Sequence, residues 1–354
     1  MRLRLHDRPG QPARLNARTL LGLFQWIIFT IFLLLLSDSG NAAGPLFVAT
    51  NGKVEILLLA STHTPDTFSQ ETAATIRTLL PKSQRICLEG DRTAGFAAEE
   101  WLQRYAQQNP SLAAKNVLTD SNINEIRMLT KRYPWANASN IDRILALPPY
   151  FAAEILASLA PISGDPSPKA VALDDVVLDA TQSRNLASCF LETVEMAYLP
   201  TTTVSIESSK AYLKFALRAL NSERFRQKIR NHETQQLRRL FVERRLASFC
   251  RAESRYMASN GLMEVYDKSI TSRNAGLVER LTHETENVES VFVAIGALHF
   301  CGKGGIPKEL RRLGFSVVSL DQDAYRRRAG HNIGTTSPIE NSSATSRLSQ
   351  EALP

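Results

Sequence analysis

The sequence predicts an α/β fold: a mixed, largely parallel sheet flanked by helices, with helical insertions. Between residues 45 and 325, short apolar runs alternate with helical patterns, which is typical of strands joined by crossover helices. The apolar runs are nearly continuous, as expected for strands that are buried on both faces of a sheet. Two longer stretches, near 97–158 and 208–260, are helical in pattern and predict insertions into this core.

The first part of the pattern is strand, helix, strand. Residues 54–60 predict a buried strand, and residues 67–80 predict a helix whose apolar positions recur on one face. Thr67 and Gln70 stand at capping-box spacing at the start of this helix. Residues 85–88 predict the next strand, and this order of elements favours parallel pairing of the two strands.

The same alternation returns in the middle of the chain and toward the C-terminus. The expected helices span residues 175–183, 272–283 and 306–313. The expected strands, several of them rich in β-branched residues, span residues 170–173, 186–191, 291–295 and 315–320.

The N-terminal segment, residues 1–43, has the composition of an export signal. Five arginines within the first 18 residues precede an uncharged apolar run from Leu20 to Leu36, and small residues follow. Gly40 and Ala42 fit the small-x-small cleavage rule, but the apolar run is also close to the length that spans a bilayer. A cleaved signal peptide and an uncleaved membrane anchor therefore both remain open. In either case the remainder is exported, which predicts a periplasmic domain or an inner-membrane anchored one.

Composition indicates where the folded domain ends and which class of partner is not expected. Residues 326–354 are small and polar, so they cannot bury enough apolar surface to offset the cost of ordering, and we expect a disordered tail. The folded α/β domain is then expected over residues 44–325. The net charge of +7 is not concentrated in a basic patch, so nucleic acid is not an expected partner.

The chain has four cysteines, at positions 87, 189, 250 and 301. Export would place them in an oxidising compartment, and four cysteines allow three different pairings. Cys87 and Cys189 lie within apolar runs, a setting that favours buried free thiols.

Polar side chains follow the predicted strands. They are His63, Glu89, Asp174, Asp175, Glu192, His299 and Asp321. In open parallel sheets, ligands bind outside the carboxyl ends of the strands. A single carboxylate there is more often an ordinary loop residue. The two histidines are more specific, because each follows a strong strand in a small-x-x-His pattern, and together with Glu89 they predict a functional site.

These motifs resemble those of the TraB/GumN family, which includes the Tiki proteins. The family has two Gly-x-x-His motifs, a strand-end Glu after the first, and an Arg-Asn pair before the second. The corresponding stretches here are Ala60–His63, Glu89, Arg273-Asn274 and Gly296–His299, and the resemblance covers about residues 46–325. Ala60 stands where the family has Gly, which is compatible with a tight strand exit only if residue 60 avoids positive φ.

The resemblance implies metal-dependent peptide hydrolysis. By this analogy His63 and His299 would bind a divalent ion, and Glu89 would be a third ligand or the general base. Imidazole and carboxylate ligands suit Mn, Co, Zn or Fe. Arg273 would face the developing oxyanion or a substrate carboxylate.

Three further residues receive supporting roles under the same analogy. Asn274 would cap a helix or orient a neighbour, and Asp174 and Glu192 would fix the tautomers of the histidines.

Two other functions remain open. One is a metal-independent, esterase-like hydrolase in which His and Glu act as acid and base. The other is a non-catalytic envelope protein, or polysaccharide-associated protein, that uses the cleft for binding. The substrate is expected to be a peptide or a small molecule, and the N-terminal segment would contact the membrane if it is not cleaved.

Overall fold

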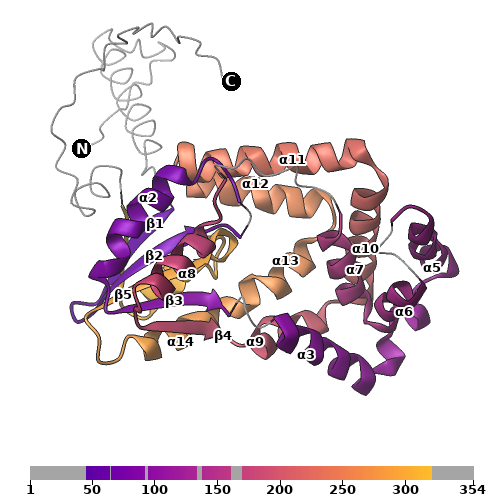
Figure 1. Ribbon diagram of the computed structural model, residues 1–354, viewed down its shortest axis with the longest axis horizontal. Coiled ribbons are helices and arrows are strands. Elements are labelled where there is room, and N and C mark those ends of the chain that lie inside the picture. The colour runs from indigo at the N-terminus through magenta and orange to yellow at the C-terminus, as the bar shows by residue number, and fades with distance from the viewer. Residues whose placement is uncertain (1–44, 64, 92–94, 134–137, 161–169, 321–354) are drawn as a thin grey trace, which may run out of the picture. The chain divides into compact units, whose positions relative to one another are not determined.

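A computed structural model describes residues 45–320, apart from residues 64, 92–94, 134–137 and 161–169 (Figure 1). These described residues belong to one compact unit. The predicted export signal, the predicted tail and Asp321 lie outside the described residues. Among the helices that are described, none has the length and apolar composition needed to cross a bilayer.

The core is a six-stranded mixed sheet with the strand order β4-β3-β5-β2-β1-β6 (Figure 1). The strands are β1 (Leu46–Thr50), β2 (Glu55–Ser61), β3 (Arg85–Gly90), β4 (Ser188–Glu192), β5 (Ser290–Gly296) and β6 (Ser316–Ser319). Strands β4, β3, β5 and β2 pair in parallel, whereas β1 pairs antiparallel with both β2 and β6. The predicted α/β fold with a largely parallel mixed sheet is confirmed.

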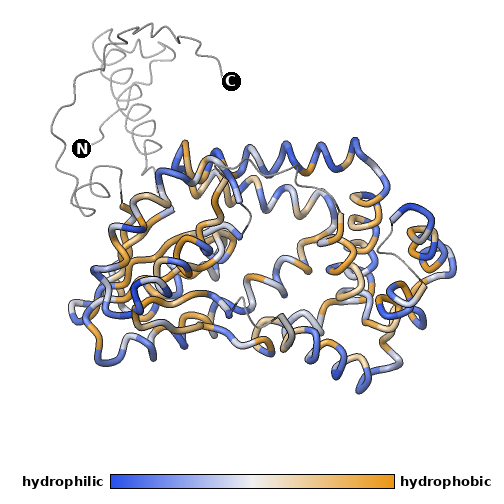
Figure 2. The backbone as a smooth tube through the Cα atoms, viewed as in Figure 1, coloured by the Kyte–Doolittle hydropathy of each residue, from blue (hydrophilic) through white to orange (hydrophobic). Residues whose placement is uncertain are grey.

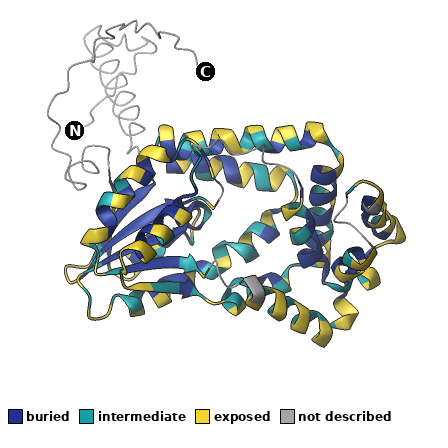
Figure 3. Ribbon diagram, viewed as in Figure 1, coloured by how far each residue is buried: buried dark blue, intermediate teal, exposed yellow. Residues whose placement is uncertain are grey.

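The two central strands are buried almost throughout. In β2 and β5 every residue after the first is buried, which explains their nearly continuous apolar sequences. They run in register, with Ala60 opposite Ile295 and Ser61 opposite Gly296. Their carboxyl ends therefore reach the same edge of the sheet at the same level. Figures 2 and 3 show the strands as largely hydrophobic and buried.

Helices that connect the strands pack in pairs. The helices α2 (Gln70–Leu79) and α8 (Leu173–Ser183) contact each other, as do α14 (Asn274–Glu284) and α15 (Ile306–Arg312). Their buried residues extend the core of the sheet. These four helices correspond to the predicted connecting helices.

Three local expectations differ from the structure. The predicted strand at 170–173 is wrong: Val171 forms only an isolated bridge with Asp66, and α8 begins at Leu173. Two aspartates in the first turn favour a helix start there. The capping box is also wrong, since α2 begins after Ser69, and the Asp66 carboxylate accepts the N–H groups of residues 68 and 69. Strand β1 was not predicted.

The two stretches predicted as helical insertions are helical. The first contains α3 (Gly95–Gln108), α4 (Ala114–Val117), α5 (Asp120–Arg127), α6 (Ala138–Ala146) and α7 (Pro149–Ser158). The second contains α10 (Ile206–Asn221), α11 (Glu223–Leu237), a π-helical turn (Arg238–Val242) and α12 (Leu246–Ser259). Helix α7 packs along α10, and buried residues of both insertions form a second hydrophobic core.

Shorter helices complete the described chain. They are α9 (Val194–Tyr198), α13 (Met263–Ser269) and the 3-10 helices Leu80–Lys82, Pro110–Leu112, Met128–Lys131, Leu199–Thr203, η6 (Thr271–Arg273) and η7 (Ala297–Phe300).

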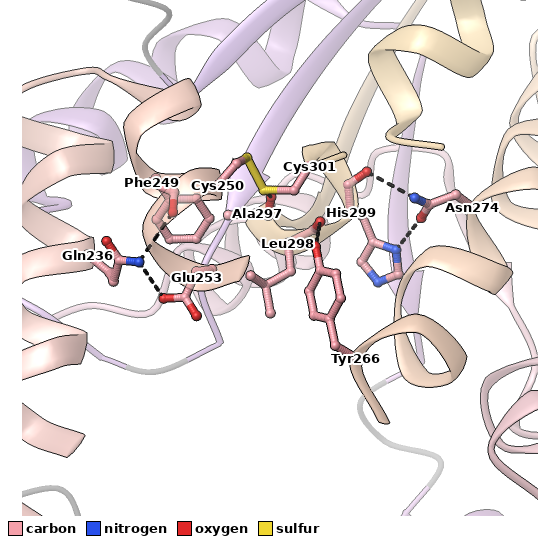
Figure 4. Close-up of a disulfide and its surroundings, with 10 residues drawn as sticks. All are labelled: Gln236, Phe249, Cys250, Glu253, Tyr266, Asn274, Ala297, Leu298, His299 and Cys301. Carbon is pink, nitrogen blue, oxygen red and sulfur yellow. Dashed lines mark hydrogen bonds between the residues drawn. A yellow bond between two sulfur atoms is a disulfide. The ribbon is translucent and has the colours of Figure 1, made fainter. Parts of the chain in front are cut away.

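Two disulfides join segments that are distant in sequence. Cys87 and Cys189 face each other in register on β3 and β4, with 4.5 Å between their Cα atoms, so the expectation of free thiols is wrong. Neighbouring parallel strands bring the two apolar runs together, which the runs themselves do not reveal. Cys250 of α12 is bonded to Cys301, which follows η7 (Figure 4).

The Cys250–Cys301 disulfide should contribute measurably to stability. It closes a separation of 51 residues, so the double change Cys250→Ala with Cys301→Ala should lower the free energy of unfolding by about 2–4 kcal/mol. Urea denaturation of the oxidised protein measures this difference, with the wild type in reducing buffer as a control. Free thiols at these positions in non-reducing peptide mass spectrometry would contradict the pairing.

Candidate functional site

The structure brings four of the predicted site residues together at the carboxyl edge of the parallel strands. His63 follows β2, and Glu89 is the next-to-last residue of β3. His299 lies in η7 directly after β5, and Arg273 is the last residue of η6, just before α14. The juxtaposition arises because three neighbouring parallel strands end at one edge.

The Glu89 carboxylate lies at the centre of this group. Its Oε2 accepts the backbone N–H of Gly296 at 2.8 Å and lies 3.9 Å from Nε2 of His63. Its Oε1 lies 3.2 Å from Nε2 of His299 and 3.5 Å from Nη2 of Arg273. Both histidines therefore present the same ring nitrogen to one carboxylate.

Asn274 fixes the tautomer of His299. The Asn274 Nδ2 group donates to the backbone carbonyls of His299, at 3.2 Å, and Gly304, at 2.8 Å (Figure 4). The amide oxygen must then face the ring, and it lies 2.5 Å from His299 Nδ1. Because that oxygen can only accept, the proton of the neutral ring sits on Nδ1, and Nε2 carries a lone pair.

Asp174 holds His63 in the same way. The Asp174 carboxylate is buried in the first turn of α8 and accepts a hydrogen bond from Nδ1 of His63. The proton of the neutral His63 ring is thus also on Nδ1, and its Nε2 lone pair faces the Glu89 carboxylate. The side chain of His63 is 57% exposed, whereas that of His299 is 1% exposed. His63 is therefore the solvent-facing member of the pair.

Gly296 lies beneath the point where these groups converge. A Cβ atom at this position would come within 3.1 Å of Glu89 Oε2 and 3.3 Å of His63 Nε2. Both contacts are tighter than ordinary van der Waals packing, so a larger residue would push the carboxylate and the imidazole apart. Glycine in the second motif is needed for this close approach rather than for an unusual φ angle.

Ala60 of the first motif is compatible with its position. It lies inside β2, fully buried and paired with Ile295, and its φ angle is not positive. The condition under which alanine could replace glycine there is met.

Arg273 supplies the positive charge of the site. Its Nη1 donates to Oε1 of Glu192 at 2.6 Å, while its Nη2 lies 3.2 Å from Nε2 of His299. The guanidinium therefore links a carboxylate at the end of β4 to the lone pair of a buried imidazole. The structure ties Glu192 to Arg273, not to a histidine as the sequence analysis expected.

Burial and charge set the protonation of the site. Burial raises the pKa of Glu89, but the hydrogen bond and charge of His299 in its protonated form, the charge of protonated His63 and the Gly296 N–H outweigh it and lower that pKa to about 2. Burial lowers the pKa of His299 despite the nearby Glu89. Burial, only partly offset by Arg273, raises the pKa of Glu192 to about 7. At neutral pH Glu89 is ionised and His299 is neutral.

A cavity of about 770 Å³ opens onto this group, and we call it the His63 cleft. His63, Glu89, Asp174, Glu192 and Tyr198 contribute to its walls. Sequence reasoning missed Tyr198, which no motif marks and which reaches the cleft from α9. Asp174 was anticipated as a partner of a histidine, although it comes from a helix rather than from a strand end.

The chemistry of the donor set fits a divalent cation. Two imidazole Nε2 lone pairs and an ionised carboxylate converge, and each imidazole has its other nitrogen held by an outer acceptor, as is usual for metal-bound histidines. Among the described residues, however, no three His, Cys, Asp or Glu side chains are already arranged to hold an ion. Arg273 Nη2, which lies against both His299 Nε2 and Glu89 Oε1, would have to withdraw.

The chain matches the model of a known protein family. The model of the TraB/PrgY/gumN family matches residues 45–319, which is most of the chain and includes all of the residues described above. A search of curated proteins finds no match.

Replacing Asn274 should release the His299 ring. In Asn274→Ala, the His299 Nδ1–H and the two backbone carbonyls lose a buried partner, so the free energy of unfolding should fall by about 1–3 kcal/mol. The ¹⁵N NMR signals of the His299 imidazole should then lose the pattern of a ring protonated only at Nδ1. Ser272→Ala, an exposed change two residues away, should alter neither property. An unchanged imidazole spectrum in Asn274→Ala would show that the amide does not set the tautomer.

Glu192 should make stability depend on pH. Its pKa of about 7 in the folded protein exceeds the ordinary 4.5. Between these values the folded protein holds a proton that the unfolded chain releases, so the free energy of unfolding falls as pH rises through the window. Glutamine cannot titrate. The free energy of unfolding of the wild type, relative to that of Glu192→Gln, should therefore decrease by at most about 3 kcal/mol as the pH rises through this window. Urea denaturation at several pH values measures this, and a constant difference would refute the raised pKa.

Proposed function

Since the chain belongs to the TraB/PrgY/gumN family, we propose that it is a metal-dependent hydrolase with His63, His299 and Glu89 as ligands. One observation carries the proposal: both Nε2 lone pairs face the Glu89 carboxylate over Gly296. In the structure Arg273 Nη2 lies against His299 Nε2 and Glu89 Oε1, and a divalent ion in its place would neutralise the carboxylate and accept both lone pairs. A divalent ion such as Mn, Co, Zn or Fe, when bound, would polarise a scissile carbonyl and acidify a water molecule.

The ionisation states suit these roles. Glu89, with a pKa of about 2, stays ionised across the physiological range, which suits a ligand better than a proton acceptor. His299, whose pKa is lowered by burial, keeps its Nε2 free of a proton near neutrality. A proton and a metal ion compete for this nitrogen, so metal affinity should weaken at acidic pH.

Arg273 is the candidate for stabilising negative charge. Its Nη1 is tethered to Glu192 at 2.6 Å, so the guanidinium stays in place when Nη2 leaves His299. The released Nη2 group would then donate to a developing oxyanion or to a substrate carboxylate. Glu192 in this account orients the arginine.

The two disulfides support export, because such bonds persist in oxidising compartments. We therefore place the enzyme in the cell envelope, either in the periplasm or anchored in the inner membrane, in agreement with the composition of residues 1–43. The substrate proposed is a peptide or a small molecule that reaches His63 through the His63 cleft.

A metal-independent hydrolase is the second candidate, and a specific contact favours it. The Asp174 carboxylate orients His63 while the Nε2 atom of His63 faces the cleft, which is the arrangement of a general base with its orienting group. In this case Arg273 would keep its contact with His299 and supply positive charge to the reacting group. A protein that only binds its ligand is the remaining alternative.

Metal content separates these functions. The protein purified without chelator should carry about one divalent ion per chain by inductively coupled plasma mass spectrometry. The double change His63→Ala with His299→Ala should abolish binding, because two of the three ligands are lost. His283→Ala, an exposed histidine on α14, is the matched control and should retain the ion.

Activity completes the test. Glu89→Gln should reduce kcat/KM for peptide or ester substrates by at least about 100-fold, and metal removal should do the same. Hydrolysis that survives metal removal but is lost in His63→Ala would instead establish the metal-independent enzyme. Ligand uptake without turnover, in protein that carries no metal, would leave only a binding function.

A further inference from the structure

A second cavity lies beside the His63 cleft. Its volume is about 950 Å³, and its walls come mainly from α3, α6 and α7 of the first helical insertion; we call it the α3 cavity. Ala98 and Tyr198 line both this cavity and the His63 cleft. Because the same two side chains border both spaces, the cavities adjoin at this point. Each is within the size range of a site for one small molecule, so the pair suits an elongated ligand.

The walls of the α3 cavity combine apolar, amide and charged side chains, the charged ones being Glu99, Lys115 and Arg143. Leucine and isoleucine side chains contribute apolar area, and one of them, Leu159, keeps 38% of its surface exposed. Amide side chains lie among them, namely those of Gln103, Gln107 and Asn140. A binding site for an apolar chain alone would not need amides, whereas a peptide offers both apolar side chains and backbone groups that pair with amides.

Charged residues line one side of this cavity. Arg143 of α6 forms an ion pair with Glu99 of α3 at 2.5 Å, and Gln103 donates to the same carboxylate at 3.0 Å. The ion pair connects α3 to α6, whereas the Gln103 contact lies within α3. Both partners of the pair are more than half exposed, so it contributes at most about 1 kcal/mol to the position of the wall.

We propose that the α3 cavity is a specificity subsite for an extended peptide substrate that carries bulky apolar side chains. This inference rests on the proposed hydrolase function, because it places the scissile bond in the His63 cleft and the apolar side chains beyond Ala98 and Tyr198. The peptide backbone would pair with the Gln107 amide and with the oxygen of the Gln103 amide, whose nitrogen donates to Glu99. The preference for apolar residues would then be set by the insertion, not by the sheet edge that carries His63.

Trp101 provides a reporter for this junction. Its ring stacks on Tyr198, with 5.5 Å between ring centroids, and on Tyr105, with 5.2 Å between centroids. A ligand that passes Tyr198 should alter the fluorescence of Trp101, and Trp101→Phe identifies which part of the signal it contributes. Binding can thus be measured in the Glu89→Gln variant of the full chain, without turnover.

The experiment compares three probes. They are an acetylated and amidated hexapeptide of alternating leucine and alanine, its serine–alanine counterpart, and dodecanoate. The leucine peptide should bind at least about 10-fold more tightly than the serine peptide, because each buried leucine side chain contributes more than a factor of 10 in affinity when fully desolvated. Equal binding of both peptides, or tight binding of dodecanoate alone, would overturn the proposal.

A matched pair of variants tests the location. Ala98→Phe fills the junction and should weaken binding of the leucine peptide at least about 10-fold, whereas Ala97→Phe, at the exposed neighbouring position on α3, should stay within about twofold. Leu159→Ser, which removes an apolar wall at a partly exposed position, should weaken binding severalfold even if Ala98→Phe fails to fold. No change in Ala98→Phe, with a wild-type circular dichroism spectrum, would exclude this cavity.

The subsite proposal and the hydrolase proposal can fail independently of each other. Selective peptide binding in a protein that holds no metal and hydrolyses nothing would support the subsite and reject the enzyme. Metal binding and hydrolysis with no preference between the leucine and serine peptides would support the enzyme and reject the subsite.

Discussion

The site depends on parallel, in-register pairing of β2 with β5, and of β5 with β3. This pairing sends three chain segments out of the sheet at one edge and at one level, so that His63, Glu89 and His299 need only short connections to meet. The close approach is possible because the residue beneath them, Gly296, has no side chain. An antiparallel neighbour in the place of β5 would have carried His299 to the opposite edge.

The direction of two hydrogen bonds decides what these side chains can do chemically. Asn274 and Asp174 each accept a hydrogen bond from Nδ1 of a histidine, and each acceptor is buried, which limits competition from water for the bond. Both Nε2 atoms are left with lone pairs toward Glu89. A site with the same residues but the opposite tautomers would present two N–H donors to the carboxylate, and it would have no free nitrogen for a metal ion or a proton.

The disulfides brace the same edge of the molecule. Cys87 lies two residues before Glu89 and Cys189 three residues before Glu192, so one bond ties together the strands that carry these carboxylates. Cys301 lies two residues after His299 and ties its segment to α12 of the second insertion (Figure 4). Tyr266 of α13 also donates to the backbone of Leu298 beside it. The segment that carries the buried histidine is thus held from two sides by the helical part of the chain.

The sequence by itself determined the class of fold and the residues of the candidate site. Short, continuous apolar runs that alternate with helical patterns indicate strands buried on both faces, and the small-x-x-His patterns mark where two of them leave the sheet. The sequence did not show which distant segments pair with each other. The disulfide between Cys87 and Cys189 and the pairing of Arg273 with Glu192 depend on strand order and register. The residues around a cysteine or an arginine do not show which distant residue it will contact. Only the order and register of the strands in the assembled sheet decide such long-range pairs.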